Sequence, residues 1–131
     1  MGWTTPTDRT TGYTVTAADW NIVEDDLSFL YGDTGWTNVS AFTNSWVAGS
    51  VAPAYILIGR VVWLRGDIQS GTAGTVAFTL PSGYRPSAQM VYPANISGGV
   101  TVNQIVIAST GTVILATSSH TFLSNINFPT V

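Results

Sequence analysis

Short segments rich in β-branched and aromatic residues dominate the chain after residue 34, which is typical of strands. The clearest two are Val61–Ile68 and Thr75–Leu80. Between them, Gln69–Gly74 carries two glycines that can adopt positive φ. Pro81 ends the second segment, because proline cannot donate a ladder hydrogen bond. The pattern predicts a central hairpin, spanning 60–86, in an all-β domain.

Segments of the same kind continue to the C-terminus, separated by glycine- and serine-rich turn signals. The remaining predicted strands are Trp36–Val39, Phe42–Val47, Tyr55–Gly59, Ala88–Tyr92, Val100–Ala108, Thr112–Ala116 and Thr121–Phe128. Val100–Ala108 and Thr112–Ala116 flank a Ser-Thr-Gly turn and predict a second hairpin. Many short strands at this spacing predict an antiparallel β-sandwich, jelly-roll-like, over residues 34–131.

Several apolar strand positions are expected to be buried, either in the core of the sandwich or in an interface. They are Trp63, Leu64, Ile68, Phe78, Leu80, Ile107 and Ile114.

Residues 16–33 follow a helical period instead. Thr16 can cap the helix, with Asp19 at the return position of a capping box. Gly32 is predicted to end the helix as its C′ residue. The apolar residues of this segment recur on one face as a narrow seam. The helix seam consists of Trp20, Val23, Leu27 and Leu30. Either the helix lies on the β domain, or its seam joins copies of the chain in a short bundle.

The charge content is unusually low. Only 8% of the residues are charged, against about 25% in ordinary soluble domains. The four cations are all arginines, and six of the seven acids fall within residues 1–33. This shift marks a boundary near residue 33. A net charge of −3 argues against nucleic-acid binding, which needs a basic surface.

Sequence signals for export, membranes and thiol chemistry are missing. The N-terminal residues have no signal-peptide pattern, and no apolar run approaches the roughly 18 residues of a membrane span. The chain has no cysteine, which excludes thiol catalysis and cysteine-ligated metals. We expect no cofactor and no membrane partner.

The sequence contains no complete set of residues typical of a known catalytic site. His120 is the single histidine, and a Ser-His-Asp triad would need Asp67 or an N-terminal acid to orient it. No Gly-x-Ser-x-Gly elbow places a serine. Asp33–Gly35 matches the aspartic-protease triplet, but Asp and Gly are also ordinary turn residues. The acids Glu24–Asp26 are consecutive in the predicted helix and point in different directions, which disfavours a metal site. We expect no enzyme.

Carbohydrate binding is a further hypothesis, because five Trp and five Tyr could provide stacking platforms on an uncharged surface. The alternative is that Trp46 and Trp63 are core or interface aromatics within strands.

Several phrases, in their order, resemble virion surface proteins of tailed bacteriophages. Thr16–Asn21 is similar to a helix opening common in small tail and fibre proteins of these phages. Val61–Ile68, followed by Phe78–Pro86, resembles the "G-x-V-x-L-x-G … LP-x-GYRP" pattern of fibre-head domains. Ile107–Val113 and Leu123–Phe128 are similar to its final strands. The family motif comprises Leu80, Pro81, Gly83, Tyr84, Arg85 and Pro86.

This resemblance implies a homotrimeric β-sandwich on the virion surface, with the helix near the three-fold axis and without enzymatic activity. Fibre tips normally follow a long shaft, whereas only residues 1–33 precede the head here. We therefore expect a capsid decoration protein or head spike bound to the major capsid protein or another virion protein. The alternative is a tail-tip or tail-fibre module that recognises host surface carbohydrate.

Residues 1–15 are threonine-rich and predict an extended arm. Trp3 and Tyr13 are its large apolar side chains, and Pro6 gives it a rigid bend. The arm has no evident core of its own in which to bury these groups. These side chains either fold back onto the chain's own domain or dock on the virion. We expect docking, with synthesis in the host cytoplasm and a final location at the virion surface.

Overall fold

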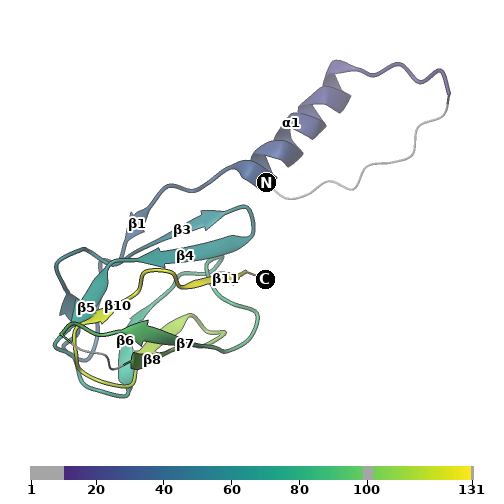
Figure 1. Ribbon diagram of the computed structural model, residues 1–131. Coiled ribbons are helices and arrows are strands. Elements are labelled where there is room, and N and C mark those ends of the chain that lie inside the picture. Colours follow the sequence, from purple (N-terminus) through teal and green to yellow (C-terminus); the bar gives the residue numbers. More distant parts are fainter. Residues whose placement is uncertain (1–10, 99–101, 131) are drawn as a thin grey trace.

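The computed structural model describes residues 11–98 and 102–130. Figure 1 shows a β-sandwich and, standing apart from it, a single helix, α1 (Ala17–Tyr31). All strand pairs are antiparallel. The predicted mainly β fold with one short helix is therefore confirmed.

The strands of the described residues are short. They are β1 (Thr37–Asn38), β2 (Val47–Ala48), β3 (Ala54–Ile58), β4 (Val61–Arg65), β5 (Asp67–Gln69), β6 (Thr75–Thr79), β7 (Met90–Asn95), β8 (Val102–Ile107), β9 (Thr112–Leu115), β10 (Thr121–Phe122) and β11 (Asn127–Pro129).

These strands form three sheets. Two four-stranded sheets, β1-β3-β4-β11 and β6-β9-β8-β7, are joined by a small sheet in the order β10-β5-β2. One apolar core draws on all three sheets and on the loops between them. Its largest fully buried side chains include Trp46, Ile68, Phe78, Leu80, Ile105, Ile107, Leu115, Leu123 and Phe128.

The predicted central hairpin is wrong. β4 pairs with β3 and β11, β5 pairs with β10 and β2, and β6 pairs with β9. Gly66 breaks the predicted strand Val61–Ile68 in two with a φ of 88°. A Cβ at Gly66 would lie 2.5 Å from the carbonyl oxygen of Ala52, so only glycine fits this bend. Residues 69–74 consequently connect two sheets instead of closing a hairpin.

The second predicted hairpin is confirmed, since β8 pairs with β9 in the register Ile107↔Val113. The predicted strand Thr121–Phe128 is instead divided between two sheets, as β10 and β11. Asn125 lies between them with a φ of 72°, a left-handed conformation that asparagine tolerates better than most residues.

Most of the predicted strand Phe42–Val47 is not a strand, and a turn lies within it. Asn44 and Ser45 have φ values of 53° and 64°, so regular pairing begins only at Val47. The turn carries Trp46 into the core, where its side chain is buried and its Nε1 donates to Oγ1 of Thr75 at 3.2 Å. Trp46 is thus a core aromatic.

Gly71 lies against the Trp46 indole so closely that a Cβ there would overlap the ring. We expect Gly71→Ala to lower the free energy of unfolding by about 1–3 kcal/mol, because the buried ring must move. Thr72→Ala, at the neighbouring exposed position, should change it by less than about 0.5 kcal/mol. Urea denaturation followed by circular dichroism measures both. Equal stability of Gly71→Ala and the wild type would contradict the close packing.

Most positions predicted to be buried are buried. Five of the seven lie in the core: Leu64, Ile68, Phe78, Leu80 and Ile107. Ile114 is half-buried. Trp63 is 40% exposed, because it points away from the core on β4, between the inward-facing Val62 and Leu64. An interface role for Trp63 stays a prediction.

The capping box of α1 is present as predicted. The Thr16 side chain accepts from the Asp19 amide, and the Asp19 carboxylate accepts from the Thr16 amide. Gly32, however, is not a left-handed C′ residue. It is the C-cap with an extended backbone, φ −69° and ψ 150°, and its N–H donates to the Ser28 carbonyl at 2.7 Å. The chain leaves the helix in the extended form that it needs to reach the sheet.

Candidate functional site

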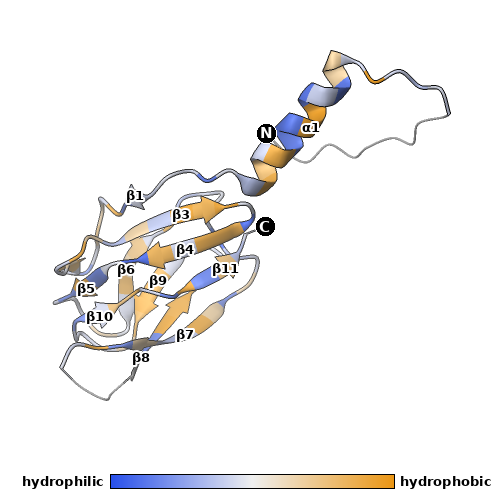
Figure 2. Cartoon of the chain, turned by 45° about the horizontal axis from the view of Figure 1, so that its top comes forward, coloured by the Kyte–Doolittle hydropathy of each residue, from blue (hydrophilic) through white to orange (hydrophobic). Residues whose placement is uncertain are grey.

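The helix α1 is joined to the sandwich at its C-terminal end and otherwise stands clear of it (Figure 1). Figure 2 shows apolar and polar stretches alternating along it. The seam side chains are exposed in the single chain, to 61%, 45%, 48% and 40% for Trp20, Val23, Leu27 and Leu30. The hypothesis of a helix lying on the β domain is therefore wrong, and the seam is open to a partner.

Hydrogen bonds join the end of α1 to the β3–β4 hairpin. The Thr34 N–H donates to the Leu57 carbonyl at 3.1 Å, and the Leu57 N–H donates to Thr34 Oγ1 at 3.1 Å. Asp33 bridges to Ile58, and its Oδ1 accepts from the Gly35 N–H at 2.9 Å. The triplet Asp33–Gly35 thus serves as a turn that fixes the helix to the sheet.

The residues expected to dock on the virion are only partly placed. Trp3 and Pro6 lie outside the described residues. Tyr13 is 41% exposed, and its hydroxyl donates to the Asp19 carboxylate at 2.8 Å. This contact holds Tyr13 near the start of α1, and its docking role stays a prediction.

The residues of the LP-x-GYRP pattern, called the corner motif below, form a corner of the fold. The Tyr84 N–H donates to the Pro81 carbonyl at 3.1 Å, and Arg85 Nε donates to the Leu80 carbonyl at 2.8 Å. The Tyr84 ring meets the Tyr55 ring edge-on, with centroids 4.8 Å apart. Leu80 and Pro86 are buried, and Gly83 has a φ of 91°. These contacts give the motif a structural role, redirecting the chain after β6.

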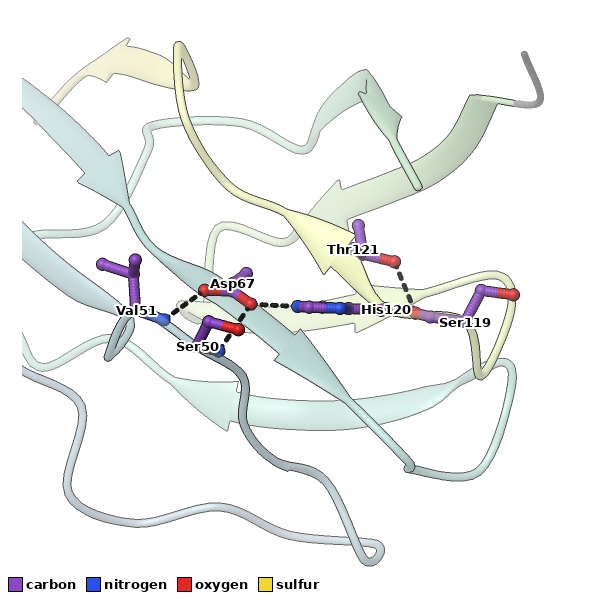
Figure 3. Close-up of polar contacts among 6 residues, drawn as sticks. All are labelled: Ser50, Val51, Asp67, Ser119, His120 and Thr121. Carbon is purple, nitrogen blue, oxygen red and sulfur yellow. Dashed lines mark hydrogen bonds and ion pairs between the residues drawn. The ribbon is translucent and has the colours of Figure 1, made fainter. Parts of the chain in front are cut away.

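Asp67 and His120 meet between β5 and the start of β10 (Figure 3). The Asp67 carboxylate is buried and accepts from the N–H groups of Ser50 at 2.9 Å and Val51 at 2.6 Å, and it hydrogen-bonds with His120 Nε2. The imidazole stacks on Phe122 with ring centroids 5.2 Å apart. Three separate segments are thus tied to one carboxylate.

Electrostatics favours a charged Asp67. Burial alone would raise the pKa of its carboxyl, but the hydrogen bonds from His120, Val51 and Ser50 outweigh this, and the pKa lies below its usual value. From the sequence, a triad with His120 would need Asp67 or an N-terminal acid as its orienting carboxylate, and the structure brings Asp67 and His120 together. His120 is half-buried in this contact, in the loop just before β10.

The Asp67–His120 pair lacks the rest of a catalytic triad. In the part of the chain that the structure describes, no serine hydroxyl contacts the imidazole, whose Nε2 is directed at Asp67. The described residues also contain no group of three or more histidine or acidic side chains arranged to hold a metal ion. The arrangement is suited to fastening loops together.

A second group of side chains lies on the outer face of the sheet β1-β3-β4-β11. Trp63 and Arg65 of β4 point away from the core, and both are exposed. The Arg65 guanidinium carbon lies 4.3 Å from the centre of the Trp36 ring, a cation–π contact. Trp36 is itself 42% exposed. The sequence hypothesis of a stacking platform did not name Trp36 or Arg65, although the alternation along β4 marks Arg65 as outward-facing.

Among the described residues, no helix has both the length and the apolar character that crossing a membrane requires.

Comparisons with known proteins find similarity in structure. No family model and no curated protein matches the chain. Among solved structures, the receptor binding protein (gp15) of Listeria phage PSA is similar with a TM-score of 0.65 and 18% sequence identity. The match covers 90% of this chain and 82% of that chain. At this identity the similarity establishes a shared fold.

Proposed function

We propose that the protein is a receptor-binding module of a tailed bacteriophage, located at the tail tip or on a tail fibre. The observation that carries this proposal is the fold similarity to a phage receptor binding protein over 90% of the chain. The phage resemblance of the helix opening and of the corner motif agrees with it. The receptor is a carbohydrate on the host surface.

The module works as a homotrimer, with the helix seam at the three-fold axis. Support comes from the exposure of all four seam residues on a helix that stands clear of its own domain. With 15 residues, α1 is too short to hold an oligomer alone, so the β domains also contribute contacts. Few charges need to be desolvated between such copies.

The proposed role is binding without catalysis. The polar groups of the Asp67–His120 pair are used in fastening loops, and the Asp33–Gly35 triplet is used in the turn after α1. Residues 1–15 dock the trimer on the virion, where three arms bind together at high effective concentration. The sandwich then faces the host.

Binding of the protein to host cells tests this proposal directly. Fluorescently labelled intact protein should bind cells of strains that the phage carrying it infects, and should block adsorption of that phage. Immunogold labelling of virions should mark tails. Labelling of capsids instead, with no binding to cells, would favour the capsid decoration protein or head spike expected from the sequence, and would contradict the receptor-binding role.

A further inference from the structure

We propose that the outer face of the sheet β1-β3-β4-β11 is a carbohydrate-stacking platform for an extended, neutral oligosaccharide of at least three pyranose rings. This inference rests on the proposed function and names the site at which it takes place. The outer platform consists of Trp36, Asn38, Ile56, Trp63, Arg65 and Asn127.

Strand register places these side chains on one face. Ile56 lies opposite Trp63, and Asn127 lies opposite Trp63 on the other side. Directly opposed residues of antiparallel strands point to the same face. Trp36 comes one residue before β1, whose pairing Thr37↔Tyr55 sets it beside Ile56. The contact between Trp36 and Arg65 confirms that it lies on this side.

Ile56 shows that the indoles lie over the sheet. Its side chain points away from the core that Tyr55 and Leu57 face, yet it is only 4% exposed. Its neighbours across the strands on this face are Trp36 and Trp63, whose side chains therefore cover it. The outer surface of an indole laid over a sheet can take the flat apolar face of a pyranose ring. At Trp36 this surface is shared with the Arg65 guanidinium, whose carbon lies 4.3 Å from the ring centre.

The spacing of the two indoles suits an oligosaccharide. Trp36 and Trp63 are separated by two strand spacings, or about 10 Å. The rings of an extended pyranose chain recur at about half that distance, so the first and third rings can each stack on an indole while the middle ring passes over Ile56. One tryptophan alone would fix neither the direction nor the length of the ligand.

Polar groups beside the indoles can orient the sugar. Arg65 lies opposite the small Ala54, which leaves room for its side chain to reach Trp36. Asn38 and Asn127 are exposed on the same face, next to Trp36 and Trp63. The guanidinium donates hydrogen bonds, and the amide groups both donate and accept them, so together they can pair with sugar hydroxyls. Arg65 is the one charged residue of the outer platform, and its guanidinium already contacts the Trp36 ring, so the platform offers mainly stacking and hydrogen bonds, which a neutral sugar can use in full.

Tryptophan substitutions test the site. The probe is surface polysaccharide extracted from a strain whose cells the wild-type protein binds. Calorimetric titration should show an affinity loss of about tenfold or more for Trp36→Ala and for Trp63→Ala, as for other flat rings stacked on aromatic side chains. Tyr31→Ala removes the most exposed aromatic of the described residues, 79% exposed on α1, and should bind as the wild type does. Periodate oxidation of the polysaccharide should abolish binding.

Other outcomes overturn the inference in distinguishable ways. Unchanged affinity in both tryptophan variants means that the sugar binds elsewhere, while the receptor-binding role stands. Cell binding that is lost after protease treatment of the cells, and not after periodate, excludes a carbohydrate ligand. A lower oligomeric mass of Trp36→Ala or Trp63→Ala in sedimentation means that the face joins copies of this chain. Failure of the wild type to bind any cells or polysaccharide removes the proposed function itself.

Discussion

Replacing Asp67 with alanine is expected to lower the free energy of unfolding by about 3–5 kcal/mol. The carboxylate is buried and accepts from two backbone N–H groups, those of Ser50 and Val51, and it also hydrogen-bonds with His120. Alanine would leave these donors without the charged partner around which the three segments are arranged, and water could replace it only in part, because the Asp67 side chain is itself buried. Gly49 lies so close to Asp67 and His120 that no larger residue fits there, so the surrounding loop is poorly able to rearrange.

Chemical denaturation of the intact chain measures this loss. Asp25→Asn, which neutralises an exposed carboxylate on α1, is the matched control and should stay within about 0.5 kcal/mol of the wild type. A midpoint of unfolding in Asp67→Ala equal to that of the wild type would show that the three segments are held by other contacts.

The same carboxylate predicts how stability depends on pH. The pKa of Asp67 is lower in the folded chain than the value of about 3.9 expected in the unfolded chain. Its contribution is therefore fully present above about pH 4, and is lost as the pH falls through the folded-state pKa. Asp67→Ala should accordingly show a shallower loss of stability in this acidic range than the wild type, measured by denaturation at a series of pH values.

Leu27→Asp should dissociate the proposed trimer. Burying a leucine side chain stabilises by about 2 kcal/mol, and each trimer would lose three of them, or about 6 kcal/mol. Such a loss weakens assembly by roughly four orders of magnitude. Three carboxylates brought together on the axis add electrostatic repulsion. Light scattering at micromolar concentration should give a trimer mass for the wild type and a monomer mass for the variant.

Asn21→Asp is the control for this assembly, because it adds the same charge to α1 at an exposed position outside the helix seam. It should keep the trimer mass. Circular dichroism should confirm that both variants fold. A wild-type chain that is monomeric at this concentration, or a Leu27→Asp variant that stays trimeric, would contradict assembly through the seam.

Local chemistry explains which elements could be predicted from the sequence. The capping box of Thr16 and Asp19 involves residues three apart, so the start of α1 is encoded where it forms. The hairpin of β8 and β9 is similarly local. Local chemistry does not decide the role of Gly66, because a single glycine inside a strand pattern can be tolerated or can divide the strand between two sheets. Only the close approach of Ala52, distant in sequence, decides between these outcomes.

Partners distant in sequence account for what could not be predicted of the candidate sites. Asp67 and His120 are 53 residues apart, and the sequence suggested them as a pair without showing that backbone amides would occupy the carboxylate. Trp46 and Trp63 both lie in segments predicted as strands, yet one is buried and the other is exposed. Their difference depends on a turn with two left-handed residues before Trp46, which the apolar pattern conceals.

The junction between α1 and the sandwich also determines how the molecule carries mechanical load. When α1 is held fixed and the sandwich is pulled, the force passes along residues 32–38. The Thr34–Leu57 hydrogen bonds and the β1–β3 pairing transmit part of this force to β3. β3 in turn lies beside β4, the strand that carries Trp63. The path from α1 to the outer platform therefore crosses only neighbouring strands of one sheet, and the sheet β6-β9-β8-β7 stays outside it.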